Sequence, residues 1–317
     1  MKKGIFLVIF VLMLSACQVL GESKNHHITV LMWAEHPALR DSYEGMAQYF
    51  KEHHEEEVYI ELKNAYGNVG NAMLIADQAG QKNVDAVYAI ATPAVQAVLA
   101  RFQDKKDIPI VFSAVSDPVE AGLLKNEKEP EGQLTGVSDF PPLEKQVDLM
   151  LDLLPDLESV AVLYHLGEAN SRQQIIILEK LLKQRDIRLD VKGISSSEEI
   201  APASKSLSKK SDTIFIVNDN MIASATGLVC HQFAEEAKPC FMAEAGQFDQ
   251  GVFASDSVSY YDLGYQAGEM LSEIVLHKKA IAELPVIYAQ DTELHINQEL
   301  AKKWGIPIPQ KYVERMR

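Results

Sequence analysis

The chain has 317 residues, of which 47% are apolar, so it is long enough to fold as two domains with sizeable cores. Its 30 basic and 45 acidic residues give a net charge of -15, which excludes nucleic acid as a partner because phosphate backbones repel such a surface. Only three cysteines are present, so packed cores rather than disulfides must hold the fold together.

The first residues have the pattern of a secretory signal. Two lysines precede an apolar run over residues 5–14 that is too short to span a bilayer, and no other stretch of the sequence is long and apolar enough to do so. The run ends in Leu14-Ser15-Ala16-Cys17, which resembles the bacterial lipobox. We predict a signal peptide over residues 1–16, lipidation (palmitate) of Cys17 and a tether over 17–27, which together anchor the protein to the extracytoplasmic face of the cell membrane. An ordinary signal peptide with an incidental cysteine is the alternative.

From residue 28 the chain alternates short β-branched runs with helical patterns, which is typical of βα units around a parallel sheet. Four strands are expected in the first half, with a helix after the first strand and another after the third. The strands are expected at 28–32, 58–62, 86–90 and 108–112, and the helices at 39–52 and from Thr92 to about Phe102.

The same order recurs in the second half of the chain. Strands are expected at 160–164, 187–191, 212–217 and 238–242, with a helix over 171–183. The run Asp212 to Val217 matches Asp85 to Ile90, and Pro239 matches Pro109. The matched Asp and Pro positions favour a true repeat over the chance likeness of any two α/β halves. The predicted fold class is therefore α/β, with two doubly wound, Rossmann-like lobes.

Several crossings between the lobes are expected to form a hinge. The segment 134–139 reads as a strand-like crossing, followed by a helix over 143–154, and residues 252–255 and 285–288 are candidate return crossings. We predict a first lobe of residues 28–138 plus about 256–284, and a second lobe of residues 139–255 plus about 285–317.

In open parallel sheets, ligands bind at the carboxyl ends of the strands, so the loops after the strands are the candidate site. The candidate ligand-binding residues in these loops are His36, Thr92, Pro93, Ser113, Ala114, Val115, Asp117, Glu168, Asn170, Ser171, Asp219, Asn220 and Glu244.

Three of these candidates have equally simple structural explanations. Thr92 precedes Pro93 at a helix start, where backbone N–H groups favour a ligand carboxylate, but it could equally be a helix cap. Asp219 could accept a ligand ammonium or cap the next helix. His36 could line the cleft or make a local hydrogen bond.

No enzyme or metal signature is found in the sequence. The nucleophile elbow, the phosphate-binding loop, the zinc-protease pair and the dinucleotide fingerprint are all missing, which favours a binding protein over an enzyme. No cofactor or metal is expected, because His53 and His54 stand at a helix end whose polar face is solvated. Cys230 falls in a helical pattern and Cys240 opens a buried strand, and the two could form a disulfide.

Five ordered motifs resemble a known family. They are Glu35 to Leu39, Ala89 to Ala94, Val111 to Val119, Thr135 to Asp139 and Asn218 to Asn220. Together they are similar to the substrate-binding lipoproteins of ABC importers in the tryptophan/tyrosine-binding (TrpX-like) group, over about residues 28–309.

The resemblance implies a type I periplasmic-binding fold that captures an aromatic amino acid between its lobes, without chemistry, and delivers it to a permease and its ATPase. We expect a monomer that holds the ligand carboxylate at Thr92 and Ser113 to Val115, and the ammonium at Asp219. A sensory lipoprotein without a transport role and an extracytoplasmic hydrolase are the alternatives.

Overall fold

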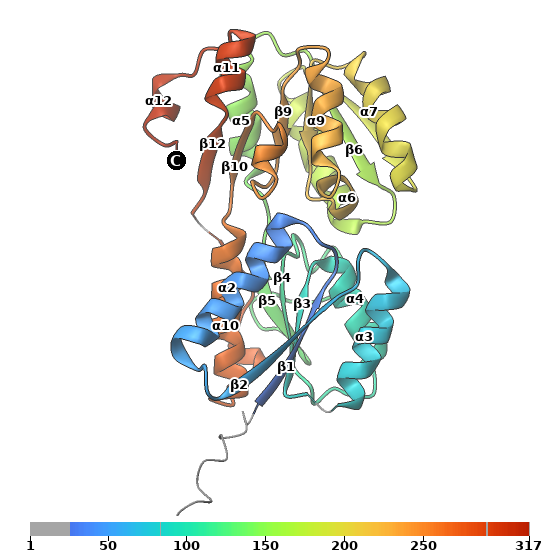
Figure 1. Ribbon diagram of the computed structural model, residues 1–317, viewed down its shortest axis with the longest axis vertical. Helices are drawn as coiled ribbons and strands as arrows, with labels where there is room; N and C mark the ends of the chain where they lie inside the picture. Colours follow the sequence, from blue (N-terminus) through green and yellow to red (C-terminus); the bar gives the residue numbers. More distant parts are fainter. Residues whose placement is uncertain (1–25, 83, 290, 317) are drawn as a thin grey trace, which may run out of the picture.

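The protein is described by a computed structural model that covers residues 26–82, 84–289 and 291–316. Two lobes lie one above the other along the long axis of the molecule (Figure 1). Each lobe is built on a six-stranded sheet, and the two sheets have the same strand order. The predicted signal peptide, Cys17 and most of the predicted tether lie outside the described residues.

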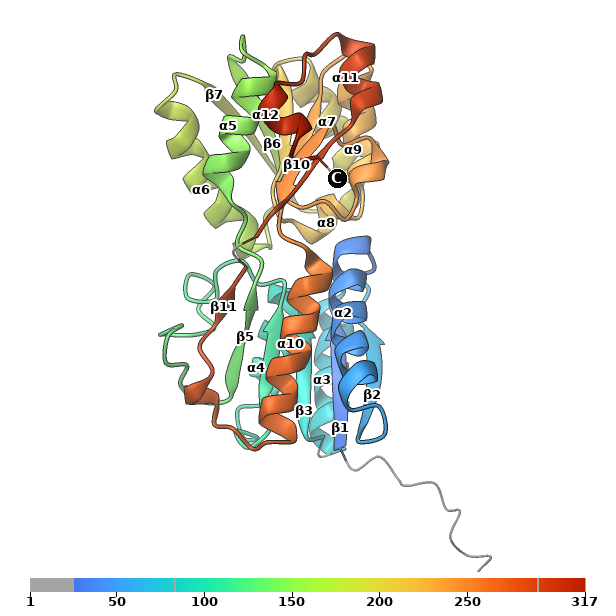
Figure 2. The ribbon, with the colours of Figure 1, turned by 90° about the vertical axis from the view of Figure 1, so that its left-hand side faces the viewer.

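The first lobe has the strand order β11-β5-β4-β3-β1-β2, parallel at every pairing. Helices α2 and α10 cover one face of this sheet, and α3 and α4 cover the other (Figure 2). The bounds are β1 (His26–Met32), α2 (Pro37–His53), β2 (Val58–Asn64), α3 (Val69–Gln81), β3 (Ala86–Ile90), α4 (Thr92–Arg101), β4 (Ile110–Ser113), β5 (Leu134–Ser138), α10 (Tyr260–Val275) and β11 (Ile287–Tyr288).

The second lobe repeats the arrangement in the order β12-β10-β9-β8-β6-β7, with β12 as an antiparallel edge strand. The bounds are α5 (Leu143–Leu153), β6 (Ser159–His165), α6 (Ala169–Lys183), β7 (Arg188–Ile194), α7 (Ile200–Ser208), β8 (Thr213–Ile216), α8 (Asn220–Ala223), α9 (Thr226–Ala234), β9 (Cys240–Met242), β10 (Ala254–Ser257), β12 (Glu293–Ile296), α11 (Gln298–Trp304) and α12 (Gln310–Val313).

Alternation along the central strands gives each sheet two apolar faces. In β8, Phe215 packs into the core beneath α5 and α6, whereas Ile214 and Ile216 pack into the core beneath α7 and α9. Successive side chains of a strand point to opposite faces, so an uninterrupted apolar strand needs helices on both sides. The predicted doubly wound fold is confirmed, and with it the internal repeat.

The chain crosses between the lobes after β5, after β10 and after β11. Two expected crossings are corrected. The run at 252–255 enters β10, a buried strand of the second sheet, and the crossing follows it. Ile287 and Tyr288 pair with β5 in the first sheet, and Val286 is buried in that lobe's core. The last crossing therefore follows residue 288 rather than 285.

Two smaller expectations also change. His26 and His27 were assigned to the tether, but they are the first residues of β1 and pair with Val58 and Tyr59 of β2. Within the described residues, no helix has the length and apolar character needed to cross a membrane.

Candidate functional site

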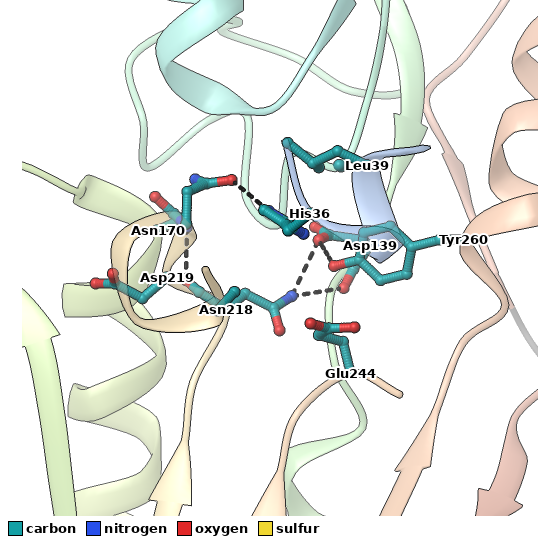
Figure 3. Close-up of a pocket in the computed structure, with 11 residues that line it drawn as sticks. His36, Leu39, Asp139, Asn170, Asn218, Asp219, Glu244 and Tyr260 are labelled. Atoms are coloured by element: carbon teal, nitrogen blue, oxygen red, sulfur yellow. Dashed lines mark hydrogen bonds between the residues drawn. The ribbon is translucent and has the colours of Figure 1, made fainter. Parts of the chain in front are cut away.

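A small cavity of about 20 Å³ lies where the two lobes meet (Figure 3). We call it the inner cavity. Both lobes contribute to it, and most of its residues lie one to four positions after the end of a strand. It is lined by His36, Leu39, Ala114, Asp139, Asn170, Asn218, Asp219, Asn220, Ala223, Glu244 and Tyr260.

The fold brings these residues together because parallel strands end at one edge. His36 follows β1 and Ala114 follows β4 in the first lobe, whereas Asn218 follows β8 and Glu244 follows β9 in the second. Asp139 stands at the crossing after β5, and Tyr260 is the first residue of α10, which begins just after another crossing. The inner cavity is therefore bordered by the hinge as well as by both sheets.

Asp139 is a buried carboxylate with one oxygen left open. Its Oδ2 accepts hydrogen bonds from Asn218 Nδ2 at 3.0 Å and from the Tyr260 hydroxyl. Its Oδ1 and the Oδ1 of Asn218 are buried without a hydrogen-bond partner among the described residues. Burial raises the pKa of Asp139 because the charged form loses its hydration. An unsatisfied buried acceptor pair of this kind favours a ligand that donates.

Glu244 is the second carboxyl group that faces the inner cavity (Figure 3). Its Oε2 accepts a 2.6 Å bond from the Gly246 amide, and its carboxyl group also contacts the amide of Gln247. Burial, with smaller contributions from the charges of Asp139 and Asp41, raises the pKa of Glu244 to about 8. Glu244 therefore carries a proton over much of the neutral range when no cation is beside it.

Asp219 also reaches the inner cavity, but its oxygens are occupied. Its Oδ1 accepts from Ile222 N at 3.0 Å, which caps α8, and its Oδ2 accepts from His165 N at 2.7 Å and Ser171 Oγ at 2.8 Å. Three donors from the protein leave Asp219 with much less capacity for a ligand than Asp139.

Glu168 is likewise committed to the second lobe. Its Oε2 accepts from the backbone N–H of Asn220 at 2.9 Å and from its side-chain amide at 2.7 Å, and its Oε1 accepts from Met221 N at 3.2 Å. Burial, followed by the charge of Asp219, raises the pKa of Glu168 to about 8.

His36 joins the lobes. Its Nε2 lies 3.3 Å from Asn220 Oδ1 and its Nδ1 lies 2.9 Å from Gln247 Nε2, and both partners belong to the second lobe. Burial lowers the pKa of His36 to about 4, so the ring is neutral at neutral pH. The imidazole therefore contributes hydrogen bonds across the cleft and no charge.

The first lobe also has unpartnered backbone N–H groups near the cavity, and that of Ala114 belongs to a lining residue. Ala91 and Ala114, at the ends of β3 and β4, have φ angles of 83° and 54°, which non-glycine residues rarely adopt. The backbone N–H groups of Thr92, Ala114 and Val115 find no acceptor among the described residues. Unpartnered N–H groups at a helix start and a strand end suit a carboxylate.

Other expected residues of the first lobe lie behind this edge. Ser113 is buried and shares hydrogen bonds with Ser42 at 2.6 Å and Tyr88 at 2.5 Å. Pro93 is in the first turn of α4. Asp117 caps a turn by accepting from Glu120 N at 2.9 Å, and it lines a surface depression formed by loop residues 117–128.

A larger cavity of about 440 Å³ lies next to Asn220, which also contacts His36. We call it the outer cavity, and Asn220 lines both cavities. Its apolar walls come from Trp33, Ile200 and Met221, and exposed Tyr66 stands at its edge. A volume of several hundred Å³ is typical of small-molecule pockets.

Of the residues expected from the sequence, six line the inner cavity and one more lines the outer: His36, Ala114, Asn170, Asp219, Asn220, Glu244 and, in the outer cavity, Glu168. Thr92, Pro93, Ser113, Val115, Asp117 and Ser171 lie near or behind the edge without lining either cavity. Leu39, Asp139, Asn218, Ala223, Tyr260 and Trp33 were not expected. For Asp139 the available signal was its position directly after a predicted strand.

Neither a metal centre nor a disulfide emerges from the described residues. They contain no group of three or more His, Cys, Asp or Glu side chains suited to a metal ion. Cys230 and Cys240 are both buried and both free.

Two doubly wound lobes that share a polar cavity at a three-segment hinge define a two-lobed solute-binding protein. The model of the family described as ABC transporter substrate binding protein matches residues 27–315. The chain belongs to this family. It is therefore the substrate-binding component of an ABC transporter, with a type I periplasmic-binding fold, and not an enzyme.

Individual relatives agree in sequence and in structure. A tyrosine-binding protein of Clostridioides difficile is 33% identical over 282 residues, which cover 88% of this chain and 81% of the relative. A Streptococcus pneumoniae ABC domain in complex with L-Trp superposes with a TM-score of 0.88 at 29% identity, covering 92% of this chain and 98% of that one. A substrate-binding protein with adhesive properties from Clostridium difficile, ligand-free and open, gives 0.71 at 30% identity over the same shares.

The two superpositions indicate the conformation described here. Sequence identity is nearly equal in the two cases, yet the TM-score is 0.88 with the L-Trp complex and 0.71 with the ligand-free open structure. Together with the bonds from His36 to the second lobe, this indicates that the lobes are closed. An inner cavity of about 20 Å³ has room for about one water, so a ligand enters only when the lobes part.

Proposed function

We propose that the protein captures a free aromatic amino acid, with tyrosine and tryptophan as the first candidates, and delivers it to an ABC permease. The observation that carries the proposal is the pair of open acceptors, Asp139 Oδ1 and Asn218 Oδ1, beside an apolar outer cavity. The printed ligands of two relatives, tyrosine and L-Trp, support the same class.

We assign the ligand ammonium to Asp139 and Glu244 rather than to Asp219. An ammonium group has three donors, and the residues lining the inner cavity offer the unpartnered oxygens Asp139 Oδ1, Asn218 Oδ1 and Asn170 Oδ1 together with the Glu244 carboxyl group. Asp219 already accepts three hydrogen bonds from the protein.

We assign the carboxylate to the backbone N–H groups of Thr92, Ala114 and Val115, and the aromatic ring to the outer cavity. The N–H groups lack an acceptor among the described residues, and an aromatic ring would bury the apolar walls of the outer cavity. Burying a ring of ~150–250 Å² at ~25 cal/mol/Å² supplies roughly 4–6 kcal/mol before ordering costs. Micromolar binding requires about 8 kcal/mol, so the polar contacts must supply the remainder.

Calorimetry with tryptophan, tyrosine, phenylalanine and leucine tests the ligand class. We expect the aromatic amino acids to bind at least tenfold more tightly than leucine. If none of the aromatic amino acids binds, the ligand assignment fails.

Fluorescence gives an independent test, because the chain has only two tryptophans. Trp33 lines the outer cavity, whereas Trp304 packs against Phe253 inside the second lobe. Titration with tyrosine should change the emission of the parent and of a Trp304→Phe variant, and leave that of a Trp33→Phe variant unchanged. An unchanged parent spectrum at saturating ligand would place the ring elsewhere.

We further propose that Cys17 carries a lipid and that the mature protein is a monomer tethered to the extracytoplasmic face. The basic start, the apolar run and the Leu14-Ser15-Ala16-Cys17 motif support this. A Cys17→Ala variant should leave the membrane fraction of the producing cell, and size-exclusion chromatography of the mature chain should give a monomer.

A further inference from the structure

The charges around the inner cavity have one sign. Asp139, Asp219 and Glu244 line it, Glu168 and Asp41 stand close behind, and no Lys or Arg is among the described residues that line either cavity. The buried ring of His36, which lines the inner cavity, is neutral, and His165 lines the outer cavity. A ligand ammonium therefore meets carboxyl groups, whereas a ligand carboxylate meets only backbone N–H groups.

One proton is needed to complete the hydrogen bonds that close the lobes. When Gln247 Nε2 donates to His36 Nδ1, the ring carries its proton on Nε2 and donates it to Asn220 Oδ1. The oxygen of the Gln247 amide then faces the Glu244 carboxyl group, and two acceptors cannot bond without a hydrogen between them. Glu244 must supply that hydrogen.

The opposite orientation of the Gln247 amide is less favourable. Its nitrogen would donate to an ionised Glu244, and its oxygen would accept from His36 Nδ1. His36 Nε2 still faces Asn220 Oδ1, so either both ring nitrogens would need protons and the buried ring would be charged, or the Asn220 amide would turn as well and lose the 2.7 Å bond that its nitrogen donates to Glu168 Oε2. The proton therefore belongs on Glu244 when the cavity holds no cation.

Every other charged or titratable group that faces Glu244 acts in the same direction. Asp139 stands at the hinge, Asp41 on α2 and Tyr260 at the start of α10, and the negative charges of the first two favour a protonated Glu244. His36, just before α2, faces Gln247 rather than the carboxyl group itself. A cation placed among these groups removes the reason for Glu244 to keep its proton.

We infer that the ligand ammonium replaces the proton of Glu244, and that the site therefore selects the amine of its ligand rather than the carboxylate. Glu244 loses H⁺ to solvent, the ammonium keeps its three hydrogens, and the new negative charge of Glu244 balances the positive charge of the ammonium. Arylalkylamines that lack a carboxylate, such as tyramine, are then ligands of the same site. This inference rests on the proposed capture of aromatic amino acids.

Analogues of tyrosine test the selection. Removing the amine, in 3-(4-hydroxyphenyl)propionate, should weaken binding by about 30-fold or more relative to tyrosine, because a buried charge contact is lost and two acceptors remain unpaired. Removing the carboxylate, in tyramine, should weaken binding by about tenfold or less. The reverse order of the two analogues would overturn the inference.

Proton release tests the exchange directly. Calorimetry of tyrosine binding at pH 7 in buffers of different ionisation enthalpy should show release of close to one proton, and affinity should rise with pH up to about 8, by at most about tenfold per pH unit. The Glu244→Gln variant should release no proton and show a flat pH profile. Glu168→Gln tests the other buried carboxyl group whose pKa is raised to about 8 and which lines the outer cavity; loss of the release in this variant and not in Glu244→Gln would assign the exchanged proton to Glu168 and overturn the inference.

The outcomes separate this inference from the proposed function. Tyrosine binding without proton release, or with release that survives Glu244→Gln, overturns the exchange and leaves aromatic amino-acid capture intact. Absence of tyrosine, phenylalanine and tryptophan binding overturns both.

Discussion

The two lobes have one fold and different chemistry at their facing edges. Both sheets run in the same strand order, and both bring the loops after equivalent strands to the cleft. The first lobe presents His36, Leu39, Ala114 and Tyr260, with free backbone N–H groups nearby, whereas the second presents the amide and carboxyl groups of Asn218, Asp219 and Glu244. The repeated fold thus determines where a ligand is held, and the residues just after each strand determine which part of the ligand each lobe can hold.

The first lobe has a closely packed pair of helices that begins near the hinge. In the first lobe, α2 and α10 approach so closely that a Cβ on Gly264 would lie 1.9 Å from Ser42 O, and one on Gly45 would lie 1.9 Å from Tyr261 O. These two helices begin beside His36 and Tyr260, so the close packing fixes two cavity residues together. The first lobe is therefore expected to move as one body with its part of the site.

The largest expected effect comes from the residue that stands between the lobes. Asp139→Asn should weaken tyrosine binding by about 30-fold or more, because a desolvated charge contact typically contributes ~2–5 kcal/mol. The melting temperature of the ligand-free protein should not fall, since the substitution removes a buried charge whose Oδ1 has no partner. Calorimetry and a thermal melt measure the two quantities. Unchanged affinity would remove Asp139 from the site.

The next effect should appear in stability. Gly264→Ala should lower the free energy of unfolding by about 3 kcal/mol, because the added methyl group meets the backbone of α2 and forces the helices apart. Gly227→Ala is the matched control in the second lobe, where the nearest atom to the new Cβ would be 3.5 Å away. Chemical denaturation compares the variants. A stability equal to that of the control would show that the helix pair has room to adjust.

The sequence predicted the repeat because its evidence is local. Strands such as Ala86–Ile90 are short, apolar and flanked by turn residues, and the structure has this strand with the same bounds. The end of the first lobe could not be predicted in the same way. The two-residue strand Ile287–Tyr288 has no periodic pattern, and only its pairing with β5 assigns it to the first sheet.

The candidate site was predictable in position and only partly in chemistry. Loops after strands were identified, and His36, Asn220 and Glu244 are in them. What the sequence could not show is which acceptors are already occupied. Asp219 and Asp139 both come shortly after strands, so the sequence does not distinguish them. Asp219 accepts three hydrogen bonds from the protein. Asp139 keeps its Oδ1 open, and Tyr260, far away in sequence, donates to its other oxygen.

That contrast makes Asp219→Asn informative. The amide nitrogen introduced at Oδ2 would face His165 N–H, so a buried donor would lose its acceptor and stability should fall by about 1–2 kcal/mol. Affinity for tyrosine should fall less than in Asp139→Asn. Thermal melts and calorimetry on both variants decide. A larger loss of affinity in Asp219→Asn would return the ammonium to Asp219.

The carboxyl groups of the second lobe should make the ligand-free protein less stable at alkaline pH. Burial raises the pKa values of Glu168 and Glu244 from 4.5 to about 8, so the folded state binds more protons than the unfolded state within that range, and stability falls as pH rises through it. The lowered pKa of His36 acts oppositely between about 4 and 6.5, so the cleanest window is pH 6.5 to 8. The melting temperature should fall across it, and less so in a Glu168→Gln, Glu244→Gln double variant. A rise would contradict the assignment.

The smallest effects should come from the residues that make the lobes most alike. Asp85 and Asp212 stand before β3 and β8, and each accepts a 2.8 Å hydrogen bond from a backbone N–H at the start of the neighbouring strand, His27 in one lobe and Ser159 in the other. The sequence match between these two positions thus reflects a shared structural task, far from the cavities. Asp85→Asn and Asp212→Asn should each lower the free energy of unfolding by about 1 kcal/mol, because each weakens hydrogen bonding to the neighbouring strand. Tyrosine affinity should stay unchanged, because neither residue lines the cleft. Denaturation and calorimetry on the pair test this equivalence. A change in tyrosine affinity in either variant would mean that the aspartate influences closure of the lobes. The two lobes would then differ in the effect of their strand-to-strand hydrogen bonds as well as in the residues at the cleft.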